Sequence, residues 1–356
     1  MQVRWRGEKN SVRDEAGRVG GLAVNEAQPP EIINRLSDSV YSSFAMLAGI
    51  QLDLFTPLDG GPLSTEEIAD MLSVQDTKLR PLLYALVVAG LLSVEDGLFA
   101  NTPEADGYLV QGKPSYLGGG HELELMLWEA ALKTAATIKT GTPQAKIDYF
   151  SMPEEELAAF FRGIHPGTIV VARNLMEHYD FSTLRSLLDV GGGSGGLAIA
   201  LTESHPQLRA TVVDLALVTP FTKRFVEEAN AADRVEVVTA DVVRDVLSGS
   251  FDVAVASKLT QVLSPDEVRA TLGNVANVLE PGGVIHLFTQ VLDDSRLSPE
   301  EAVSFNLVFL NVYDHGQAYT EQEYRDWLAE AGFVDFERVP LPSEPKNSIL
   351  TARKPT

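Results

Sequence analysis

A glycine run, GGGSGG at residues 191–196, carries the clearest sign of chemistry in this sequence. It lies between an apolar segment at 184–190 and a helix-like segment at 197–203. Glycine tolerates positive φ and lets a ligand approach the main chain closely. The helix that follows offers free N–H groups and the positive end of its dipole. A strand, a glycine turn and a helix in this order predict a cradle for a cofactor.

Two cofactor classes fit this run. Read as G-x-G-x-x-G from Gly191 to Gly196, it is the dinucleotide fingerprint, with Asp214 placed to bind a ribose. Read from Asp189 as D-x-G-x-G-x-G, it is the turn of methyltransferases that use S-adenosylmethionine (SAM). Asp189 favours SAM, because its charge would attract the ammonium group of that cofactor and repel a pyrophosphate. An NAD-dependent dehydrogenase is the disfavoured alternative.

Alternating strand-like and helix-like segments predict how the run is positioned. Apolar, β-branched segments bounded by turn residues indicate buried parallel strands at 184–190, 210–213, 235–239, 251–256 and 284–289. Helical segments lie between them at 197–204, 219–231 and 265–279. This order predicts an α/β fold with an open parallel sheet and right-handed crossovers. Ligands of such sheets bind at the carboxyl ends of the strands, where the glycine run lies.

Further polar residues fall at the same strand ends. Asp214 would accept hydrogen bonds from the ribose hydroxyls of SAM, and Asp241 would meet the adenine amino group. Ser257 and Lys258 would line the methionine or ribose part. Ordinary strand-end turns are the alternative role of the two aspartates. The complete set expected to bind the cofactor is Asp189, Gly191, Gly193, Gly195, Asp214, Leu215, Asp241, Val242, Ser257 and Lys258.

Length, charge and composition narrow the class of protein. The 356 residues suffice for two domains, and the net charge of −22 argues against a nucleic-acid partner. There is no cysteine, which excludes disulfides and thiolate chemistry, and we expect no metal site. No apolar run is long enough to cross a bilayer, and the polar segment 1–25 lacks the apolar core of a signal peptide. We therefore expect a cytoplasmic protein without a membrane partner.

The segment 32–109 has the pattern of helices followed by a small wing. Ser64 and Glu67 form a capping-box sequence, 78–89 has helical spacing, and an Asp-Gly turn within 91–99 predicts a hairpin. This winged-helix pattern suggests a SAM-binding transcriptional regulator as one alternative. From 53 to 106, however, ten acidic residues stand against two basic ones, the reverse of a DNA-binding balance. Dimerisation is the expected role.

This layout resembles the acetylserotonin/caffeate-type O-methyltransferase family of class I SAM-dependent methyltransferases, over about residues 35–353. The segment Pro281-Gly282-Gly283, a turn that recurs before the fifth strand of these enzymes, adds to the resemblance. It implies a Rossmann-like sheet, an N-terminal winged-helix-like dimerisation domain, a homodimer, a small-molecule substrate, and SAM converted to S-adenosylhomocysteine. The expected organisation is a flexible arm (1–30), the dimerisation domain (31–112), a helical linker and substrate-pocket region (113–180), and the SAM-binding domain (181–356).

The chain departs from this family where the base is expected. The family motif K-W-x-x-H-D-W supplies a histidine that deprotonates the acceptor hydroxyl, but Val262 occupies the histidine position here. Thr289 and Gln290 stand where its acidic partner is expected, and Tyr319 replaces the arginine of G-x-x-R-T. A hydroxyl with a pKa of about 10 needs a base, whereas a thioether has no proton to lose. The departure therefore favours S-methylation, in which proximity and orientation supply most of the catalysis.

Segments 38–49 and 160–165 look like those of the methylthiohydroxybutyrate S-methyltransferases of bacterial dimethylsulfoniopropionate synthesis, a branch of the same family. The resemblance implies 4-methylthio-2-hydroxybutyrate as the acceptor and a sulfonium product, formed without a general base. An arginine would clamp the carboxylate, and aromatic faces would stabilise the cation. Candidate substrate-binding residues are His121, Trp128, Tyr149, Phe161, Arg162, His165 and Arg173, with Glu122 and His178 as further candidates.

An O- or C-methyltransferase of an aromatic natural product is the main alternative. An O-methyltransferase would need a relocated base, for which His121 and His165 are the candidates. An acceptor carbon already activated as an enolate would need no base.

Overall fold

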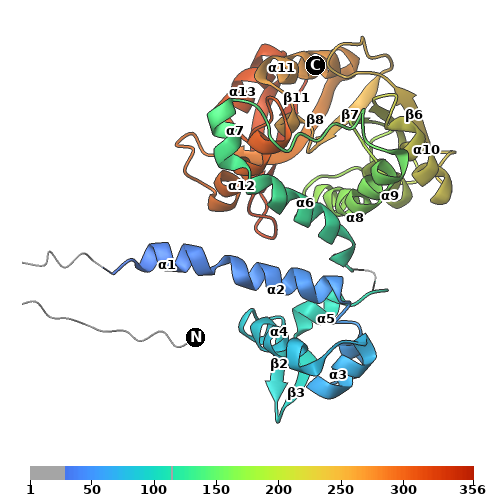
Figure 1. Ribbon diagram of the computed structural model, residues 1–356. Coiled ribbons are helices and arrows are strands. Elements are labelled where there is room, and N and C mark those ends of the chain that lie inside the picture. The colour runs from blue at the N-terminus through green and yellow to red at the C-terminus, as the bar shows by residue number, and fades with distance from the viewer. Residues whose placement is uncertain (1–28, 114) are drawn as a thin grey trace, which may run out of the picture.

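The computed structural model describes residues 29–113 and 115–356, with only the backbone at 119, 121 and 122. Residues 1–28 of the expected N-terminal arm therefore lie outside the described residues, as do the side chains of His121 and Glu122. Figure 1 shows a small N-terminal domain, blue to cyan, below a larger α/β domain, with α6 (His121–Ala131) between them.

The N-terminal domain combines helices with a three-stranded sheet. Its helices are α1 (Glu31–Asp38), α2 (Val40–Gln51), α3 (Thr65–Leu72), α4 (Asp76–Val88) and α5 (Pro103–Leu109), with a 3-10 turn η1 (Pro57–Gly60). Its strands are β1 (Leu63–Ser64), β2 (Leu92–Glu95) and β3 (Leu98–Asn101), in the order β1-β3-β2. The predicted hairpin and the capping box are confirmed: the Glu67 N–H donates to Ser64 Oγ at 3.2 Å, and the Ser64 N–H to Glu67 Oε2 at 2.8 Å. Strand β1 was not predicted, since two residues give no periodic pattern.

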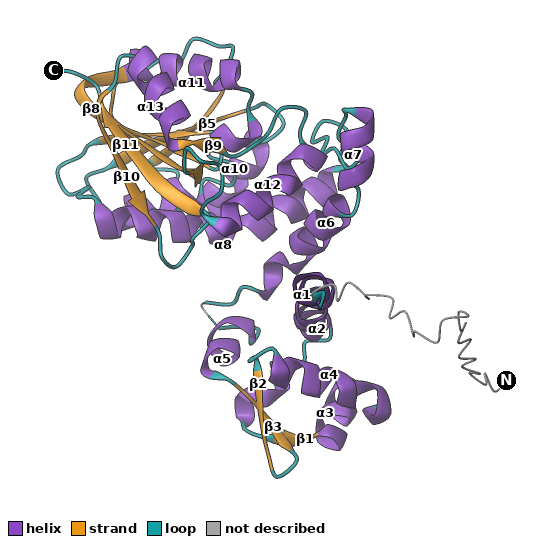
Figure 2. Ribbon diagram, turned by 90° about the vertical axis from the view of Figure 1, so that its left-hand side faces the viewer, coloured by secondary structure: helices purple, strands orange, loops and turns teal. Residues whose placement is uncertain are grey.

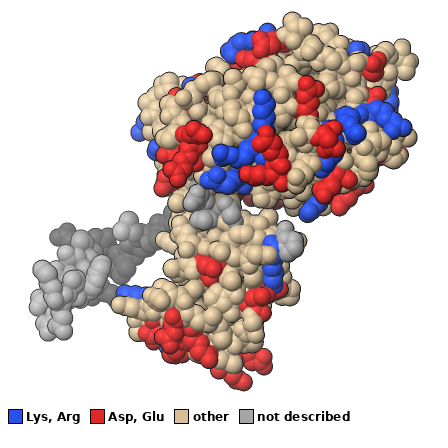
Figure 3. Space-filling model, turned by 90° about the vertical axis from the view of Figure 1, so that its right-hand side faces the viewer, with Lys and Arg blue, Asp and Glu red and all other residues tan. Residues whose placement is uncertain are grey.

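Helices α1 and α2 present apolar side chains to solvent. No residue of α1 is buried, and Ile32, Ile33, Leu36, Tyr41 and Phe44 are exposed. Figure 2 shows the two helices end-on beneath α6. A contiguous exposed apolar surface of this kind marks a site of protein–protein interaction. On the face in Figure 3, acidic side chains gather at the far end of this domain, as its composition predicted.

The larger domain is built around a mixed sheet of eight strands. Seven of them run in the order β10-β11-β8-β7-β4-β5-β6, and β9 pairs with β8. The strands are β4 (Ser186–Val190), β5 (Arg209–Asp214), β6 (Val235–Thr239), β7 (Phe251–Ser257), β8 (Leu279–Leu292), β9 (Tyr319–Thr320), β10 (Val334–Pro340) and β11 (Asn347–Arg353). All five predicted strands are present within a few residues and pair in parallel.

Two expectations about the sheet were wrong. The sheet is not entirely parallel, because β11 pairs antiparallel with β8 and β10 antiparallel with β11. The connection at 341–346 is too short for a parallel crossover, so these last strands can only form an antiparallel pair. The segment Pro281–Gly283 is not a turn before the strand either; it lies within β8, where the pairing with β7 shifts register.

Helices cover both faces of this sheet. The helices of this domain are α6, α7 (Thr134–Thr140), α8 (Glu154–His178), α9 (Gly196–Ser204), α10 (Thr219–Glu228), α11 (Pro265–Val278), α12 (Glu300–Val312) and α13 (Glu321–Glu330), with 3-10 turns η2 (Gly118–Gly120) and η3 (Thr260–Val262). Helices α8, α9 and α10 contribute to the buried core on one face, and α11 and α13 to the core on the other. The predicted helices at 197–204, 219–231 and 265–279 are confirmed as α9, α10 and α11.

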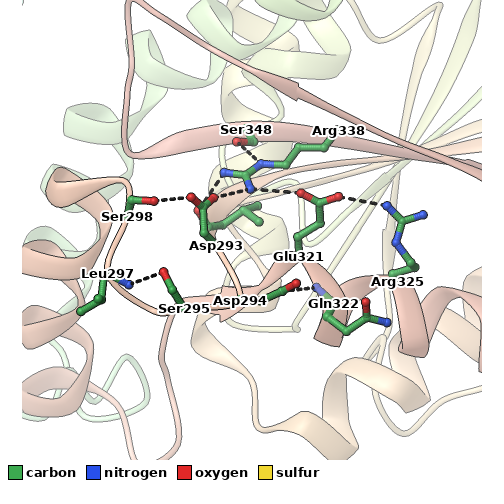
Figure 4. Close-up of polar contacts among 11 residues, drawn as sticks. Asp293, Asp294, Ser295, Leu297, Ser298, Glu321, Gln322, Arg325, Arg338 and Ser348 are labelled. Carbon is green, nitrogen blue, oxygen red and sulfur yellow. Dashed lines mark hydrogen bonds and ion pairs between the residues drawn. The ribbon is translucent and has the colours of Figure 1, made fainter.

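An ion-pair cluster fixes the segment that leads into α12. The guanidinium of Arg338 on β10 contacts Asp293 Oδ1 at 3.0 Å, Glu321 Oε2 at 3.2 Å and the carbonyl of Val291 at 3.2 Å (Figure 4). The hydroxyl of Ser298 donates to Asp293 from the other end of the segment. Arg338 is largely buried, so its contacts are less screened than those of an exposed ion pair. The start of α12 is therefore held to β8, β10 and α13.

Candidate cofactor and acceptor site

The glycine run forms a tight turn between β4 and α9. Gly191, Gly193 and Gly195 have φ of +64°, +57° and +73°, which residues other than glycine adopt only with strain. Two side chains hold the middle of the turn from neighbouring elements. Asp214 Oδ2 accepts the Gly193 N–H at 2.8 Å, and the hydroxyl of Thr222 on α10 donates to the Gly193 carbonyl at 2.5 Å. The turn is thereby fixed in one conformation.

Gly192 brings the turn against the sheet. A Cβ at this position would lie 2.6 Å from Val212 Cγ1 and 2.7 Å from Asp189 Oδ2, closer than packed atoms approach. Glycine is therefore required here for space, and the turn closes over the carboxyl group of Asp189.

Asp189 is a buried carboxyl group without a partner. It is 1% exposed, and neither side-chain oxygen makes a hydrogen bond of ordinary geometry with a described residue, although the Ala198 N–H is close enough to lower its pKa slightly. Burial, with a smaller contribution from the charge of Asp214, raises the pKa of Asp189 to about 7. A buried polar group without a hydrogen bond is unfavourable and points to a missing ligand. An ammonium group such as that of SAM is the complement of this carboxylate.

The other predicted cofactor residues lie along the same edge of the sheet. The second oxygen of Asp214 accepts the Leu215 N–H at 2.7 Å, and burial raises the pKa of Asp214 despite these two hydrogen bonds. Asp241 accepts the Val243 N–H at 2.9 Å and contacts Arg244 at 2.8 Å, so it also forms the strand-end turn that was its alternative role. The side chain of Val242 is buried in the core of the sheet.

Ser257 and Lys258 follow the end of β7. Lys258 has φ of +54°, and its N–H donates to the Phe288 carbonyl at 2.7 Å. Its ammonium lies 6.0 Å from the centroid of the Phe288 ring and 4.0 Å from where a Cβ on Gly167 would stand. Lys258 keeps solvent contact, yet desolvation by the surrounding protein lowers its pKa, as expected for a side chain in a cleft. It forms no ion pair with any described residue.

An aromatic cluster lies beside the glycine turn. Phe161 on α8 stacks on Phe221 of α10 at 5.5 Å, and Phe160 contacts both Phe161 and Tyr149. A Cβ on Gly193 would lie 3.7 Å from Phe161, so the cluster borders the turn directly. Two of the three predicted aromatic residues, Tyr149 and Phe161, therefore meet here. The third, Trp128, lies elsewhere: it contacts Phe44 of α2 at 5.7 Å.

The Tyr149 hydroxyl reaches a second tyrosine at the end of α12. Its oxygen is 3.3 Å from the hydroxyl oxygen of Tyr313. Burial raises the pKa of both phenols, and the charge of Asp214 adds to the shift at Tyr149. Tyr149 is thus near the predicted ribose site, while Tyr313 belongs to the wall formed by α12.

The basic candidates on α8 do not meet in a pocket. His165 Nδ1 is 2.9 Å from Ser194 Oγ, and its ring stacks on Phe225 at 4.4 Å, so it supports the glycine turn from behind. Burial lowers the pKa of His165. Arg162 and Arg173 are exposed, and neither forms an ion pair with a described residue. The exposed His178 contacts the carbonyl of Asn174 in its own helix at 2.8 Å. This arrangement gives no support to an arginine clamp.

The two residues before Val262 in η3, Thr260 and Gln261, belong to a hydrogen-bonded group of neutral polar side chains. The Thr260 hydroxyl is 2.8 Å from the Tyr324 hydroxyl and 3.1 Å from Thr289 Oγ1. Gln261 Oε1 accepts from Thr289 Oγ1 at 3.2 Å and from the Gln290 N–H at 3.3 Å. Burial raises the pKa of Tyr324 far above its ordinary value, so it stays protonated. No member of this group can accept a proton at neutral pH.

Comparison with known proteins gives the same fold and class. Residues 138–334 match the O-methyltransferase domain, and residues 34–111 match the O-methyltransferase dimerisation domain. The chain is 30% identical over 335 residues to the tetracenomycin polyketide synthesis 8-O-methyl transferase TcmO of Streptomyces glaucescens, covering 92% of this chain and 97% of that protein. It is 24% identical to the L-tyrosine C(3)-methyltransferase of Streptomyces lavendulae, over 88% of this chain and 90% of that one.

A solved structure agrees over nearly the whole length. The apo form of the S-adenosylmethionine-dependent methyltransferase SibL is 26% identical, with a TM-score of 0.77, and covers 91% of this chain and 99% of that chain. The chain belongs to the O-methyltransferase family. It is a SAM-dependent methyltransferase with the class I fold, and the dehydrogenase alternative is wrong.

Several residues around this methyltransferase site were missed from the sequence. They are Phe221, Thr222, Phe225, Gln261, Tyr313 and Tyr324. Phe221 and Phe225 stand four residues apart on one helix, a spacing that could have revealed an aromatic face. The others reach the site from separate elements, and no local pattern marks them.

Two further findings concern the described residues of this methyltransferase. They contain no group of three or more His, Asp or Glu side chains that could hold a metal ion. None of their helices is both long enough and apolar enough to cross a membrane.

Proposed function

We propose that this methyltransferase transfers the methyl group of SAM to the thioether sulfur of a small hydroxy acid such as 4-methylthio-2-hydroxybutyrate. The product would be a sulfonium of the kind used in dimethylsulfoniopropionate synthesis. The neutral group beside Val262 carries this proposal, because an acceptor that must lose a proton would find no base there. A thioether needs none.

Other nearby groups do not replace the missing base. The ring of His165 faces Ser194 and Phe225 rather than an open space. The phenols of Tyr149 and Tyr313 have raised pKa values, so they remain neutral near pH 7 and cannot act as phenolates. These groups suit contact with a polar acceptor better than proton transfer.

The residues of the chain would act by binding and orientation. Asp189 would bind the ammonium of the cofactor, and Asp214 its ribose hydroxyls, while the glycine turn keeps the main chain close. SAM supplies an activated methyl group on a sulfonium. As the acceptor sulfur forms its bond to that methyl, the donor C–S bond breaks, its electron pair stays on the donor sulfur, and no proton leaves. The faces of Tyr149 and Phe161 would stabilise the cationic sulfur.

We further propose that the working form is a homodimer. The match of residues 34–111 to a dimerisation domain and the exposed apolar face of α1 and α2 support it. A second copy covering this face would remove the apolar side chains from water.

Methylation of an aromatic natural product is the second candidate. The names of two relatives favour it, an 8-O-methyl transferase and an L-tyrosine C(3)-methyltransferase. Lys258 is the group that could serve as a relocated base for a hydroxyl, because desolvation by the surrounding protein lowers its pKa although the side chain keeps solvent contact. An activated aromatic carbon would need no base.

An acceptor panel at saturating SAM tests the proposal. The panel contains 4-methylthio-2-hydroxybutyrate, methionine, 3-methylthiopropionate, tyrosine and several phenols, with release of S-adenosylhomocysteine as the readout. We expect turnover of the methylthio hydroxy acid, with a kcat that is flat between pH 6 and pH 9. Turnover of phenols alone, with a pH limb that Lys258→Met abolishes, would refute S-methylation and establish the second candidate.

A further inference from the structure

A group of polar residues at the carboxyl edge of the sheet includes, besides the cofactor candidate Lys258, side chains that have no role in the cofactor cradle or the methyl transfer. We call it the edge cluster: Lys258, Gln290, Glu344, Lys346 and Asn347. Strands β7, β8 and β11 are neighbours in the sheet, and Asn347 stands opposite Gln290 in the register of β8 and β11. The cluster therefore occupies the edge at which α/β proteins bind ligands.

Gln290 has an unused hydrogen-bond acceptor. Its side chain is 3% exposed, and its Oε1 has no partner among the described residues. In β8, Phe288 belongs to the core on the α8 side, and alternation puts Gln290 on that same side. A buried amide oxygen without a donor points to a hydroxyl or N–H group supplied by a ligand.

Glu344 is held in place by two amides. Its Oε2 accepts from Asn347 Nδ2 at 2.7 Å, and its Oε1 accepts from Asn174 of α8 at 3.3 Å. These contacts fasten the loop between β10 and β11 to α8. The adjacent Lys346 extends its ammonium over the ring of Phe305 on α12, 4.4 Å from the centroid. The loop therefore presents a fixed cation beside α12.

A groove of about 530 Å³ opens beside the cluster. One side is the face of α12 that bears Phe305 and Val308, and the other side is the loop with Glu344 and Lys346. The volume suits a small organic molecule. Its lining combines apolar side chains with Lys346, the exposed Glu301 and Glu344. Because Glu344 already accepts hydrogen bonds from two amides, Lys346 is the group of this lining that suits the anionic end of a partly apolar ligand.

The two lysines of the cluster lack a direct ion pair in the described structure of a strongly acidic protein, although the charge of Glu344 acts on Lys258. Neither Lys258 nor Lys346 forms an ion pair with a described residue, although the chain has a net charge of −22. Besides desolvation, which lowers the pKa of Lys258, the charge of Glu344 raises that pKa and the charge of Lys346 lowers it. Unpaired cations next to a ligand cleft attract anionic ligands and raise their association rate.

We propose that the edge cluster binds the carboxylate and the neighbouring hydroxyl of the methyl acceptor. Lys346 would hold the carboxylate, and Gln290 Oε1 would accept a hydrogen bond from the hydroxyl. The assignment of these groups to a thioether hydroxy acid rests on the proposed function. The preference for a carboxylate does not rest on the proposed function, because it concerns one end of the acceptor and not the atom that is methylated.

Charge removal at Lys346 tests the carboxylate contact. The purified full-length variants Lys346→Gln and Lys346→Arg are compared with Lys78→Gln, which removes the same charge from the exposed face of α4. Each is assayed with the hydroxy acid and with its neutral methyl ester. For Lys346→Gln we expect kcat/KM for the acid to fall at least tenfold, mainly because KM rises. The kcat/KM for the ester and the affinity for SAM should not change. The kcat/KM of Lys346→Arg for the acid should stay within threefold of the parent value.

Either of two results would overturn this contact. If kcat/KM falls equally for the acid and the ester, Lys346 has a structural role. If kcat/KM for the acid is unchanged, the carboxylate binds elsewhere. Lys78→Gln should match the parent with both acceptors, because it lies outside the α/β domain.

The hydroxyl contact of Gln290 is tested by comparing acceptors with and without the hydroxyl group. The parent protein should prefer 4-methylthio-2-hydroxybutyrate to 4-methylthiobutyrate, and Gln290→Leu should lose that preference with unchanged affinity for S-adenosylhomocysteine. A preference that survives in Gln290→Leu would refute the hydroxyl contact. If Gln290→Leu does not fold, Gln290→Glu replaces it. Its added negative charge should weaken the binding of the acid acceptor more than the binding of the ester.

The failure of the proposed function can be distinguished from the failure of this inference. If thioethers are not turned over, the same Lys346 variants are assayed with hydroxybenzoates and their methyl esters. A loss confined to the carboxylate-bearing phenols would uphold the edge cluster while refuting S-methylation. Equal turnover of acids and esters by every variant would refute the edge cluster.

Discussion

The cofactor side and the acceptor side of the cleft are built differently. The cofactor side is a short continuous segment, β4 to β5, that contains the buried carboxyl group of Asp189, the half-buried one of Asp214 and a turn with three glycines at positive φ. The acceptor side collects neutral polar and aromatic side chains from η3, β8, α12 and α13. A cationic ligand moiety suits the first, and an acceptor that keeps all its protons suits the second. In the proposed function, two carboxyl groups lie where the donor binds, the methyl-accepting atom meets neutral groups, and the charges of the edge cluster lie at the other end of the acceptor.

Asp189→Asn tests the charged side most strongly. An unfolded aspartate titrates near pH 3.9, but burial raises the pKa of Asp189 to about 7 in the folded protein. The folded state therefore binds the extra proton between these values, so the free energy of unfolding falls as the pH rises through this window and levels off above it. Asp189→Asn should remove this slope and stabilise the free protein by about 4 kcal/mol at pH 8.

Chemical denaturation at pH 4.5 and pH 8 measures this effect in the absence of cofactor. SAM affinity of the parent should increase with pH through 7, because the ammonium needs the ionised carboxylate, and in Asp189→Asn it should be weak and independent of pH. If the free energy of unfolding depends on pH in the same way in both proteins, Asp189 ionises normally.

Asp214→Ala should weaken SAM binding about 100-fold, close to 3 kcal/mol, because charged hydrogen bonds are worth about 1.5–3 kcal/mol each. The variant should remain folded, as judged by circular dichroism, with its affinity measured by calorimetry. Asp233→Ala is the control, since Asp233 is an exposed residue paired only with Arg234. Unchanged SAM affinity in Asp214→Ala would remove Asp214 from the cofactor side.

Thr222→Val tests whether the glycine turn must be held in advance. The change leaves the Gly193 carbonyl without its donor, which costs about 1 kcal/mol, and SAM affinity should fall about fivefold. The KM of the acceptor should not change. Thr202→Val is the matched control, because that buried hydroxyl bonds only to carbonyls of its own helix. Equal effects of the two substitutions would mean that the loss is one of general packing.

Tyr313→Phe should have the smallest effect, and it should fall on the acceptor side alone. Loss of one neutral hydroxyl contact is worth about 1 kcal/mol or less, so the acceptor KM should rise about threefold with SAM affinity unchanged. Tyr84→Phe in the N-terminal domain serves as control. A fall in SAM affinity instead would assign the Tyr149–Tyr313 pair to the cofactor side.

The two sides also differ in how far the sequence could predict them. The cofactor side was predicted because a strand, a glycine turn and a helix are contiguous, and each has its own periodicity or spacing. The acceptor side joins Thr260 to Tyr324 and Gln261 to Gln290, residues that only the folded sheet brings together. The antiparallel edge was missed for the same reason: a strand pattern does not state the direction of its partner. His165 was taken for an acceptor contact because its position behind the turn depends on how α8 packs on α9.

The Arg338 cluster has a consequence for the entropy of binding. One guanidinium ties the segment before α12 to β8 and α13, so the chain enters that helix along a single path. In the acceptor site that we propose, the wall of Phe305, Val308 and Tyr313 would therefore need little ordering when an acceptor arrives. Binding loses affinity when a ligand must immobilise a mobile wall, and a wall fixed beforehand avoids that loss. A small acceptor, which offers few contacts, gains most from a pocket whose order was established during folding.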